Sequence, residues 1–263
     1  NYYKVYCVDI ERKYIMKVSV VTVTYNASAT LEETMQSVFH QSYPYIEYII
    51  IDGASADGTV NIISKYADKL SYWLSEQDKG IYDAMNKAFE VATGDFLIFM
   101  GADDLFYTND VIKNVVSQIT DLDAVYYGSV LFKGRGTKHW GQFNKIKWAV
   151  TNVSHQAIFY PKVVYTTHSY DIQYRIYADY AYNLNLLAEK VCFIYVDEII
   201  TLYDMTGISA NAHDEIFQRD FRGLVFGSVG RLAYYIGKCI RNLYFIKESL
   251  KSTYNKKRLE NKE

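Results

Sequence analysis

The chain has 263 residues, of which 50% are hydrophobic and 22% charged, and its formal net charge is −2. This length and composition predict one large folded domain, or one domain with an appendage, and exclude a disordered chain. The near-neutral charge makes no case for nucleic-acid binding.

The cysteines and the apolar runs indicate the cellular compartment of the protein and the place where its folded domain begins. The three cysteines are few and far apart, so they form no zinc spacing and favour a reducing, cytoplasmic environment. No apolar run reaches the length of a transmembrane helix. Residues 1–15 lack a clear period, whereas Met16 opens a regular pattern. We therefore expect 1–15 to be an N-terminal extension before a natural start at Met16.

The first half of the chain alternates predicted strands and helices. Lys17–Thr24 is β-branched and nearly continuously apolar, which is typical of a strand buried on both faces. The following elements, in chain order, are a helix over 31–39, a strand over 45–51, a turn-rich loop over 52–59, a helix over 60–69, a short strand over 72–74, a loop over 76–80 and a helix over 81–92. Such alternation predicts a parallel sheet.

The stretch Phe96–Met100 is five large apolar residues between turn formers, which predicts a fully buried strand. It delivers two adjacent carboxylates, Asp103 and Asp104, to the rim of the core. Two like charges at the rim of the core repel each other and are partly removed from water. A cation bound between them and an anionic ligand would explain this arrangement. The alternative is that one of them caps the helix predicted over 111–119, for which Asn109-Asp110 is better placed.

Polar residues follow three of the predicted parallel strands. Asn26, Asp52 and the Asp103–Asp104 pair stand directly after them. Ligands bind beyond the carboxyl ends of such strands, so these side chains predict one polar pocket. Its oxygen atoms suit Mg²⁺ or Mn²⁺ bridging to a diphosphate, and the ring of Tyr25 could stack on a base.

The second half is less regular. The predicted elements are a β-hairpin of 124–132 and 137–143, a short strand over 157–160, a helix that begins near Ala178-Asp179-Tyr180, strands over 191–196 and 198–203, and a flexible loop over 206–211.

The C-terminal segment changes in character. From Phe221 to Glu263 there are ten Lys and Arg against three Glu, a net charge of +7, with apolar residues interleaved at helical spacing. This basic amphipathic pattern fits an anionic membrane surface. A helix packed on the domain with a solvated basic face explains it about equally well.

Four motifs carry a resemblance to a known family: KVSVVTVTYN (17–26), DGASADGT (52–59), DKGIYDAMN (78–86) and FMGADD (99–104). In order and spacing they resemble the inverting family 2 glycosyltransferases of the GT-A fold, especially bacterial enzymes of exopolysaccharide, capsule or O-antigen synthesis. The resemblance runs in register over 16–119 and more loosely to about 211. It implies a Rossmann-like α/β fold, with a mixed, mostly parallel sheet flanked by helices and a C-terminal helical segment.

The resemblance also implies a domain division and a donor site. Residues 16–212 would form the glycosyltransferase domain, with a nucleotide-sugar half (16–119) and an acceptor half (120–212), followed by the basic helical segment 213–263. The residues implied to bind the nucleotide sugar are Thr24, Tyr25, Asn26, Asp52, Asp57, Lys79, Asp83, Asn86, Ala102 and Asp103. Within this set Asp52 would hold the base and Asp57 would support its loop.

A metal, Mn²⁺ or Mg²⁺, is implied at Asp103, the last acidic position of the family's Asp-x-Asp motif. The first acidic position is Gly101 here, which is a departure from the family pattern. Asp103 would then bind the metal alone with phosphates and waters, or with help from Asp104.

On the acceptor side, Asp179 matches the family's general base, a carboxylate that takes the proton of the attacking hydroxyl. Its alternative role is a first-turn acid favoured by the helix dipole. His155 and Gln156 stand where related sequences carry a similar pair near the acceptor, and a structurally satisfied histidine is the alternative. His213 is a weaker candidate for a metal or phosphate contact.

The expected function is sugar transfer from a nucleoside diphosphate sugar, with UDP as the expected nucleotide, to a glycan or lipid-linked acceptor in cell-surface polysaccharide synthesis. The enzyme would work in the cytoplasm or peripherally on the inner face of the plasma membrane, with residues 207–211 closing over the donor. Two alternatives remain open: a sugar nucleotidyltransferase, for which a glycine-rich basic segment is missing near the first strand, and a non-catalytic membrane-attached scaffold, which Gly101 favours.

Overall fold

The computed structural model describes residues 15–134, 136, 138–139, 141–203 and 213–243. Nearly all of the predicted extension 1–15, the whole of the predicted lid 207–211 and the chain beyond 243 lie outside the described residues. The strands are β1 (Val18–Thr24), β2 (Ile46–Asp52), β3 (Tyr72–Ser75), β4 (Phe96–Gly101), β5 (Leu105–Phe106), β6 (Val125–Phe132), β7 (Lys138–His139), β8 (Ile158–Pro161) and β9 (Phe193–Tyr203).

The strands form one sheet in the order β3-β2-β1-β4-β8-β6-β9-β5, with β7 paired to β6. The four N-terminal strands β1–β4 are parallel to one another, and β6 is parallel to β9. Strand β8 is antiparallel to both β4 and β6 and joins the two parallel groups. The predicted mixed, mostly parallel α/β sheet is therefore confirmed.

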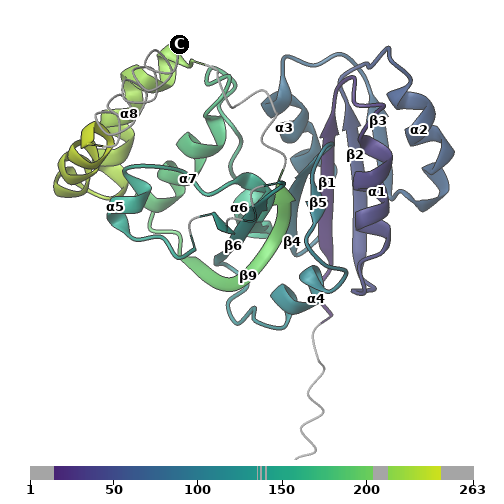
Figure 1. Ribbon diagram of the computed structural model, residues 1–263, viewed down its shortest axis with the longest axis horizontal. Helices are drawn as coiled ribbons and strands as arrows, with labels where there is room; N and C mark the ends of the chain where they lie inside the picture. Colours follow the sequence, from purple (N-terminus) through teal and green to yellow (C-terminus); the bar gives the residue numbers. More distant parts are fainter. Residues whose placement is uncertain (1–14, 135, 137, 140, 204–212, 244–263) are drawn as a thin grey trace, which may run out of the picture.

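Helices cover both groups of strands. They are α1 (Leu31–Phe39), α2 (Thr59–Lys65), α3 (Ile81–Val91), α4 (Val111–Val116), α5 (Lys145–Trp148), α6 (Lys162–Tyr165), α7 (Ala178–Ala188) and α8 (Glu215–Ser228), with 3₁₀ turns η1 (Ala67–Lys69) and η2 (His155–Ala157). Residues 231–243 form a further helix. Figure 1 shows α1 and α2 beside β1–β3, whereas α5, α7 and α8 lie at the other end of the molecule. Within the described part of the chain, no helix is long and apolar enough to cross a membrane.

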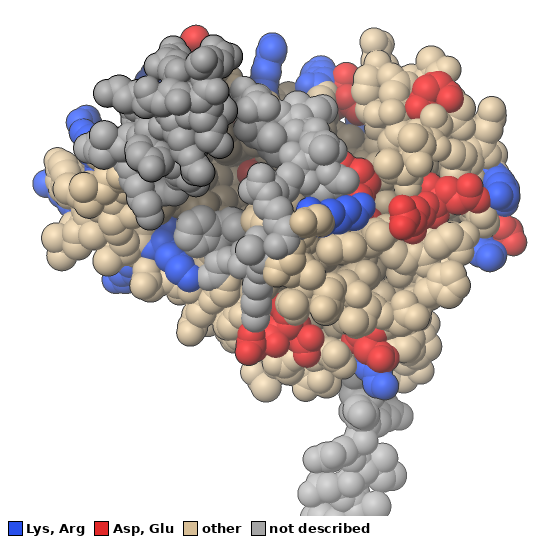
Figure 2. All heavy atoms as spheres, viewed as in Figure 1, with Lys and Arg blue, Asp and Glu red and all other residues tan. Residues whose placement is uncertain are grey.

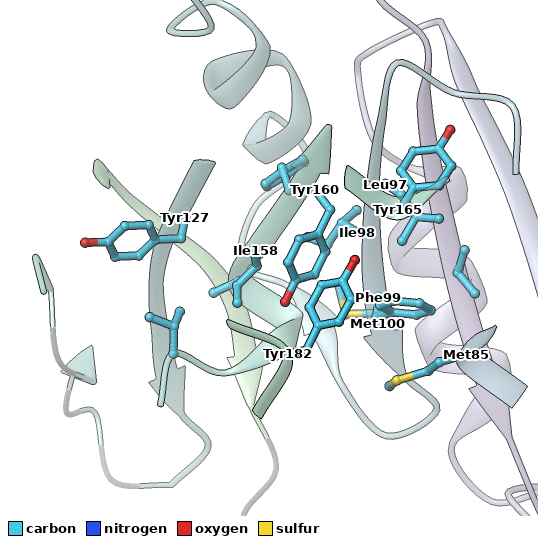
Figure 3. Packing of buried hydrophobic residues seen from close by; sticks show 14 of the residues in the cluster. Met85, Leu97, Ile98, Phe99, Met100, Tyr127, Ile158, Tyr160, Tyr165 and Tyr182 are labelled. Atoms are coloured by element: carbon cyan, nitrogen blue, oxygen red, sulfur yellow. The ribbon is translucent and has the colours of Figure 1, made fainter. Parts of the chain in front are cut away.

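The core is continuous across the sheet. All seven residues of β1 are buried, and Phe96–Met100 of β4 are completely inaccessible to solvent, as expected for strands covered on both faces. Tyrosines fill the space between β4, β8 and α7, where Tyr160 and Tyr182 pack edge to face (Figure 3). The Tyr160 hydroxyl donates a hydrogen bond to Asn183 Oδ1 at 2.9 Å, so its polar atom is satisfied inside the core.

Two local predictions are corrected, and a third is confirmed in position only. The two strands predicted over 191–203 form the single strand β9, which shifts register against β6 instead of breaking. Helix α4 ends at Val116, three residues earlier than predicted. Asp110 does stand at its N-cap, but makes no side-chain capping bond, because its Oδ1 accepts a hydrogen bond from Ser42 Oγ at 2.5 Å.

Candidate functional site

The predicted nucleotide side of the site lies where β1 and β2 end. Thr24 and Asp52 are register partners at those ends. The Asp52 side chain is completely buried and accepts hydrogen bonds from Ser55 N at 2.9 Å, Ser55 Oγ at 2.5 Å and Ser75 Oγ at 2.6 Å. Asp52 thus fixes the shape of the loop after β2, and its direct contact with a base stays a prediction.

A second carboxylate ties that loop to the segment after β1. Asp57 accepts hydrogen bonds from Thr59 Oγ1 at 2.6 Å and from Ser28 N at 3.0 Å. These bonds, that from the Thr59 hydroxyl first, hold the pKa of the Asp57 carboxyl far below its usual value. Asn26, at a left-handed φ of 49°, accepts a hydrogen bond from Ala56 N at 3.0 Å and closes the same loop. The predicted supporting role of Asp57 agrees with this geometry.

An open surface adjoins the loop. The Tyr25 side chain is 67% exposed, while Thr24 is buried and its Oγ1 has no hydrogen-bond partner among the described residues. A Cβ added to Gly53 would lie 3.4 Å from the Tyr25 ring and 2.5 Å from Asp78 Oδ2. The bare backbone of Gly53 therefore lets the ring and the carboxylate approach each other. An exposed ring beside hydrogen-bonding groups is a suitable surface for a nucleobase.

The residues around the start of α3 have structural partners. Lys79 is exposed, and its N–H donates to Asp83 Oδ2 at 3.1 Å. Asn86 uses both polar atoms on the backbone of Tyr170: Nδ2 donates to its carbonyl at 2.9 Å, and Oδ1 accepts from its N–H at 2.8 Å. Asn86 therefore fastens α3 to the segment before α7, and its predicted contact with the donor stays a prediction.

The predicted metal ligands converge at the end of β4. A Cβ on Gly101 would lie 2.5 Å from Asp104 Oδ2 and 3.0 Å from Asp103 Oδ1, so both carboxylates face the small space that a side chain at position 101 would fill. Asp104 is buried and accepts a hydrogen bond from Gln156 Nε2 at 2.8 Å. Two converging hard oxygens fit a Mg²⁺ or Mn²⁺ ion.

Those two carboxylates do not complete a metal site. No group of three or more His, Cys, Asp and Glu side chains suited to a metal occurs among the described residues. A divalent ion held at Asp103 and Asp104 would need further oxygens from a diphosphate and water, which matches a metal that arrives with its nucleotide. The Lys133 ammonium donates to the backbone carbonyl of Asp103 at 2.6 Å, which adds a cation beside this carboxylate pair.

Asp179 occupies the first turn of α7, where the helix dipole favours a negative charge. Its Oδ1 accepts hydrogen bonds from Tyr180 N at 2.7 Å and Tyr82 Oη at 3.2 Å, and its Oδ2 lies 3.3 Å from His155 Nδ1. Burial, followed by the charge of Asp179, raises the pKa of the Tyr82 hydroxyl well above its usual value. Tyr82 therefore stays protonated and acts as a donor. Asp179 is buried, with 8% of the whole residue exposed.

One short turn links the two acidic centres. In η2, His155 contacts Asp179 and the next residue, Gln156, contacts Asp104. The structure thus brings together the predicted metal and base residues, although they are far apart in the chain. Sequence reasoning did not single out Tyr82, which lies inside the 78–86 motif, or Lys133, for which no local signal exists. His213 is exposed, and no contact joins it to this network within the described part of the chain.

Comparison with known sequences identifies the same region. The sequence model described as "Glycosyl transferase family 2" matches residues 19–180, which include every predicted site residue except the weaker candidate His213. A curated relative, the "PGL/p-HBAD biosynthesis glycosyltransferase" of Mycobacterium bovis (strain BCG / Pasteur 1173P2), is 30% identical over 201 residues, covering 73% of this chain and 78% of the relative.

Solved structures share the fold. Staphylococcus aureus TarS 1–349 in complex with UDP-GlcNAc superposes with a TM-score of 0.66 at 19% identity, over 81% of this chain and 66% of TarS 1–349. The mannosyltransferase PcManGT from Pyrobaculum calidifontis, in complex with GDP-Man and Mn²⁺, gives a TM-score of 0.62 at 15% identity, over 86% and 74% of the two chains. The fold is therefore that of GT-A glycosyltransferases, and the chain belongs to glycosyl transferase family 2.

Proposed function

We propose that this glycosyltransferase is an inverting, metal-dependent enzyme that moves a hexosyl or N-acetylhexosaminyl group from a nucleoside diphosphate sugar to a glycan or lipid-linked acceptor in cell-surface polysaccharide synthesis. The observation that carries the proposal is the η2 turn, which joins the carboxylate pair at Gly101 to Asp179 through His155 and Gln156. The UDP-GlcNAc complex of the similar TarS fold makes UDP the first nucleotide to test.

In this mechanism the nucleobase of the donor lies near Tyr25 and Gly53, and its diphosphate lies at Asp103. A bound Mn²⁺ or Mg²⁺ would neutralise the charge that develops on the departing diphosphate. Asp179 accepts the proton of the acceptor hydroxyl while its oxygen attacks the anomeric carbon. The bond from that carbon to the diphosphate oxygen breaks, and the nucleoside diphosphate leaves with the electron pair. The configuration at the anomeric carbon is thereby inverted.

The test separates donor binding from chemistry. Titration calorimetry with UDP, in Mn²⁺ and in EDTA, should give metal-dependent binding that Asp103→Asn loses. Asp179→Asn should keep this binding but lower kcat for UDP release from UDP-GlcNAc, with an acceptor panel or water, by about 10²–10⁴-fold. Asp123→Asn, in an exposed turn, is the matched control. Wild-type protein that binds no nucleotide with metal would exclude the proposed donor site and favour a non-catalytic scaffold.

We also propose that the enzyme works peripherally on the inner face of the plasma membrane, through one face of the helix over 231–243. Large apolar side chains of this helix are exposed: Leu232 75%, Tyr235 56%, Ile236 37%, Ile240 44% and Leu243 66%. At about 100° per residue they fall on one stripe, with Arg231 and Lys238 along one edge. The opposite face packs on the domain, where Gly237 approaches Ala149 closely.

Charge complementarity makes an anionic lipid surface the proposed occupant of this face. Figure 2 shows Lys and Arg exposed at the left end of the molecule, where α8 lies, while the right half carries acidic side chains with Lys and Arg among them. An interfacial helix buries its apolar stripe among the headgroups and keeps cations at the edge, as this stripe is arranged. The neighbouring α8 is instead held on α7 by Phe217, whose ring packs in tilted contact with the rings of Tyr177 and Tyr180.

Vesicle flotation of the full chain tests the membrane proposal. Binding should require anionic lipid, and Leu232→Glu with Leu243→Glu should lower partitioning by at least about tenfold, since each buried Leu contributes about 1.5–3 kcal/mol. Leu122→Glu is the matched control, because Leu122 is 50% exposed in a turn elsewhere. Equal flotation of wild type and the double variant would rule this face out.

A further inference from the structure

The orientation of the Asp179 carboxylate is set by its neighbours, because the terminal torsion of an aspartate is intrinsically broad. Oδ1 is held by the Tyr180 N–H at 2.7 Å and receives a weaker contact from Tyr82 Oη at 3.2 Å. Tyr82 Oη also lies 2.7 Å from the Ile176 carbonyl, which takes its proton at the shorter distance. These bonds occupy one oxygen only. The contacts of the other oxygen, Oδ2, therefore determine how the carboxylate is oriented toward an acceptor hydroxyl.

Within the described part of the chain, His155 is the residue whose side chain contacts the second oxygen, Oδ2. Its Nδ1 lies 3.3 Å from Oδ2, and the two side chains are similarly buried, at 16% and 12% exposure. An ionised carboxylate only accepts hydrogen bonds, so the imidazole must present its Nδ1–H to Oδ2. One lone-pair direction of Oδ2 is thereby occupied and the carboxylate can no longer rotate freely.

We propose that His155 is a positioning residue: its ring fixes the rotation of Asp179 so that Oδ2 is the oxygen that receives the acceptor's proton. This inference rests on the proposed function, in which Asp179 is the base. It adds a residue that acts through Asp179 and does not itself take the proton.

The His155 ring is well placed for this role because its backbone is anchored. The next residue, Gln156, is buried; its carbonyl accepts a hydrogen bond from Thr201 Oγ1 on β9 at 2.6 Å. Its side chain donates to Asp104 Oδ2 at 2.8 Å. The turn that carries the ring is therefore fastened both to β9 and to Asp104. In the proposed mechanism this fixes Asp179 relative to the donor sugar bound beside Asp104.

The experiment compares four variants in two measurements: kcat for UDP release from UDP-GlcNAc, and the Kd of UDP with Mn²⁺ by calorimetry. His155→Ala should lower kcat by about 10–100-fold, because misplacement of a reacting group by about 1 Å costs up to about 100-fold. Its Kd for UDP should stay within about twofold. His155→Asn keeps an N–H near the position of Nδ1 and should recover most of kcat. His155→Gln places its N–H near the position of Nε2 and should recover less.

The matched control is His168→Ala. His168 is also a partly buried histidine in the acceptor half, and it pairs with the carboxylate of Glu189 at 2.9 Å, away from the proposed site. This variant should keep wild-type kcat. If His155→Ala fails to fold, the Asn and Gln variants decide the matter by their order, with Asn the more active.

Two results would overturn the inference while leaving the proposed function intact. Undiminished kcat in His155→Ala would show that Asp179 needs no such partner. Loss in His155→Asn as complete as in Asp179→Asn would mean that the ring, and not Asp179, accepts the proton, which changes the base but not the proposed reaction. By contrast, wild-type protein that neither binds UDP nor releases it from UDP-GlcNAc would contradict the proposed function itself.

Discussion

Substitution of Gly101 by alanine probes the space between the two donor-side carboxylates. Gly101 stands where the family's first acid is expected, and a Cβ there would lie 2.5 Å from Asp104 Oδ2 and 3.0 Å from Asp103 Oδ1. Carbon and oxygen atoms that are not bonded do not approach to 2.5 Å, so one group must move. The Asp104 side chain is only 1% exposed and cannot swing into solvent. We expect Gly101→Ala to push it away from Gln156.

The magnitude follows from the contact that is lost. A hydrogen bond to a charged group contributes about 1.5–3 kcal/mol, and the Gln156–Asp104 bond is buried. At about 2–4 °C per kcal/mol for a domain of this size, the melting temperature should fall by about 3–12 °C. Metal-dependent UDP affinity should weaken by at least about tenfold, because the displaced carboxylate no longer shares the space in front of position 101 with Asp103.

A double-mutant cycle distinguishes this clash from a general effect of alanine in β4. In the background of Asp104→Ala the nearer carboxylate is gone and only Asp103 Oδ1, at 3.0 Å, remains beside the new Cβ. Adding Gly101→Ala should then cost clearly less unfolding free energy than it does in the wild-type background. Urea denaturation and UDP calorimetry with Mn²⁺ would be run on all four proteins. Additive losses, or a Gly101→Ala protein with wild-type stability and affinity, would refute the argument that Asp104 occupies the place of a side chain at position 101.

Two further predictions concern the hydrogen bonds that support the site. Because the pKa of Asp57 is depressed, its contribution to stability should be complete above its ordinary value of about 3.9 and be lost as the pH falls below it. The difference in unfolding free energy between wild type and Asp57→Asn should therefore shrink from pH 6 to pH 3, and a constant difference would argue against the depressed pKa. Gln156→Leu should remove the hydrogen bond that Asp104 Oδ2 accepts and lower the unfolding free energy by about 1.5–3 kcal/mol, measured by urea denaturation; an unchanged midpoint would mean that this bond adds nothing to stability.

The parallel half of the fold was predictable because its signals are local. A strand covered on both faces reads as a continuous apolar run, and Val18–Thr24 and Phe96–Gly101 match the predicted strands within a residue or so. Helix α3 similarly ends one residue before its predicted end. Because parallel strands end at one edge, the predicted convergence of polar residues beyond β1, β2 and β4 required only the order of the elements.

The predictions that failed depended on tertiary contacts. Strand β9 reads as two pieces because Asp197 and Glu198 interrupt its apolar pattern, yet it continues by shifting register against β6. Asp110 has the residue type of a cap, but Ser42, 68 residues away, takes its carboxylate. Neither competing contact is visible in a short window of sequence, which is why local propensity was overridden in both cases.

The same distinction divides the candidate site. Its nucleotide side consists of residues that follow strands directly, such as Asn26 and Asp52, and short motifs locate them. Its acceptor side depends on pairing across long separations: Tyr82 and Asp179 are 97 residues apart, and Gln156 and Asp104 are 52. Residue type alone would make His155 a structural histidine. Only the fold shows that one turn contacts both Asp104 and Asp179. In the proposed mechanism these carboxylates serve the donor and the acceptor, so a change in η2 should disturb both.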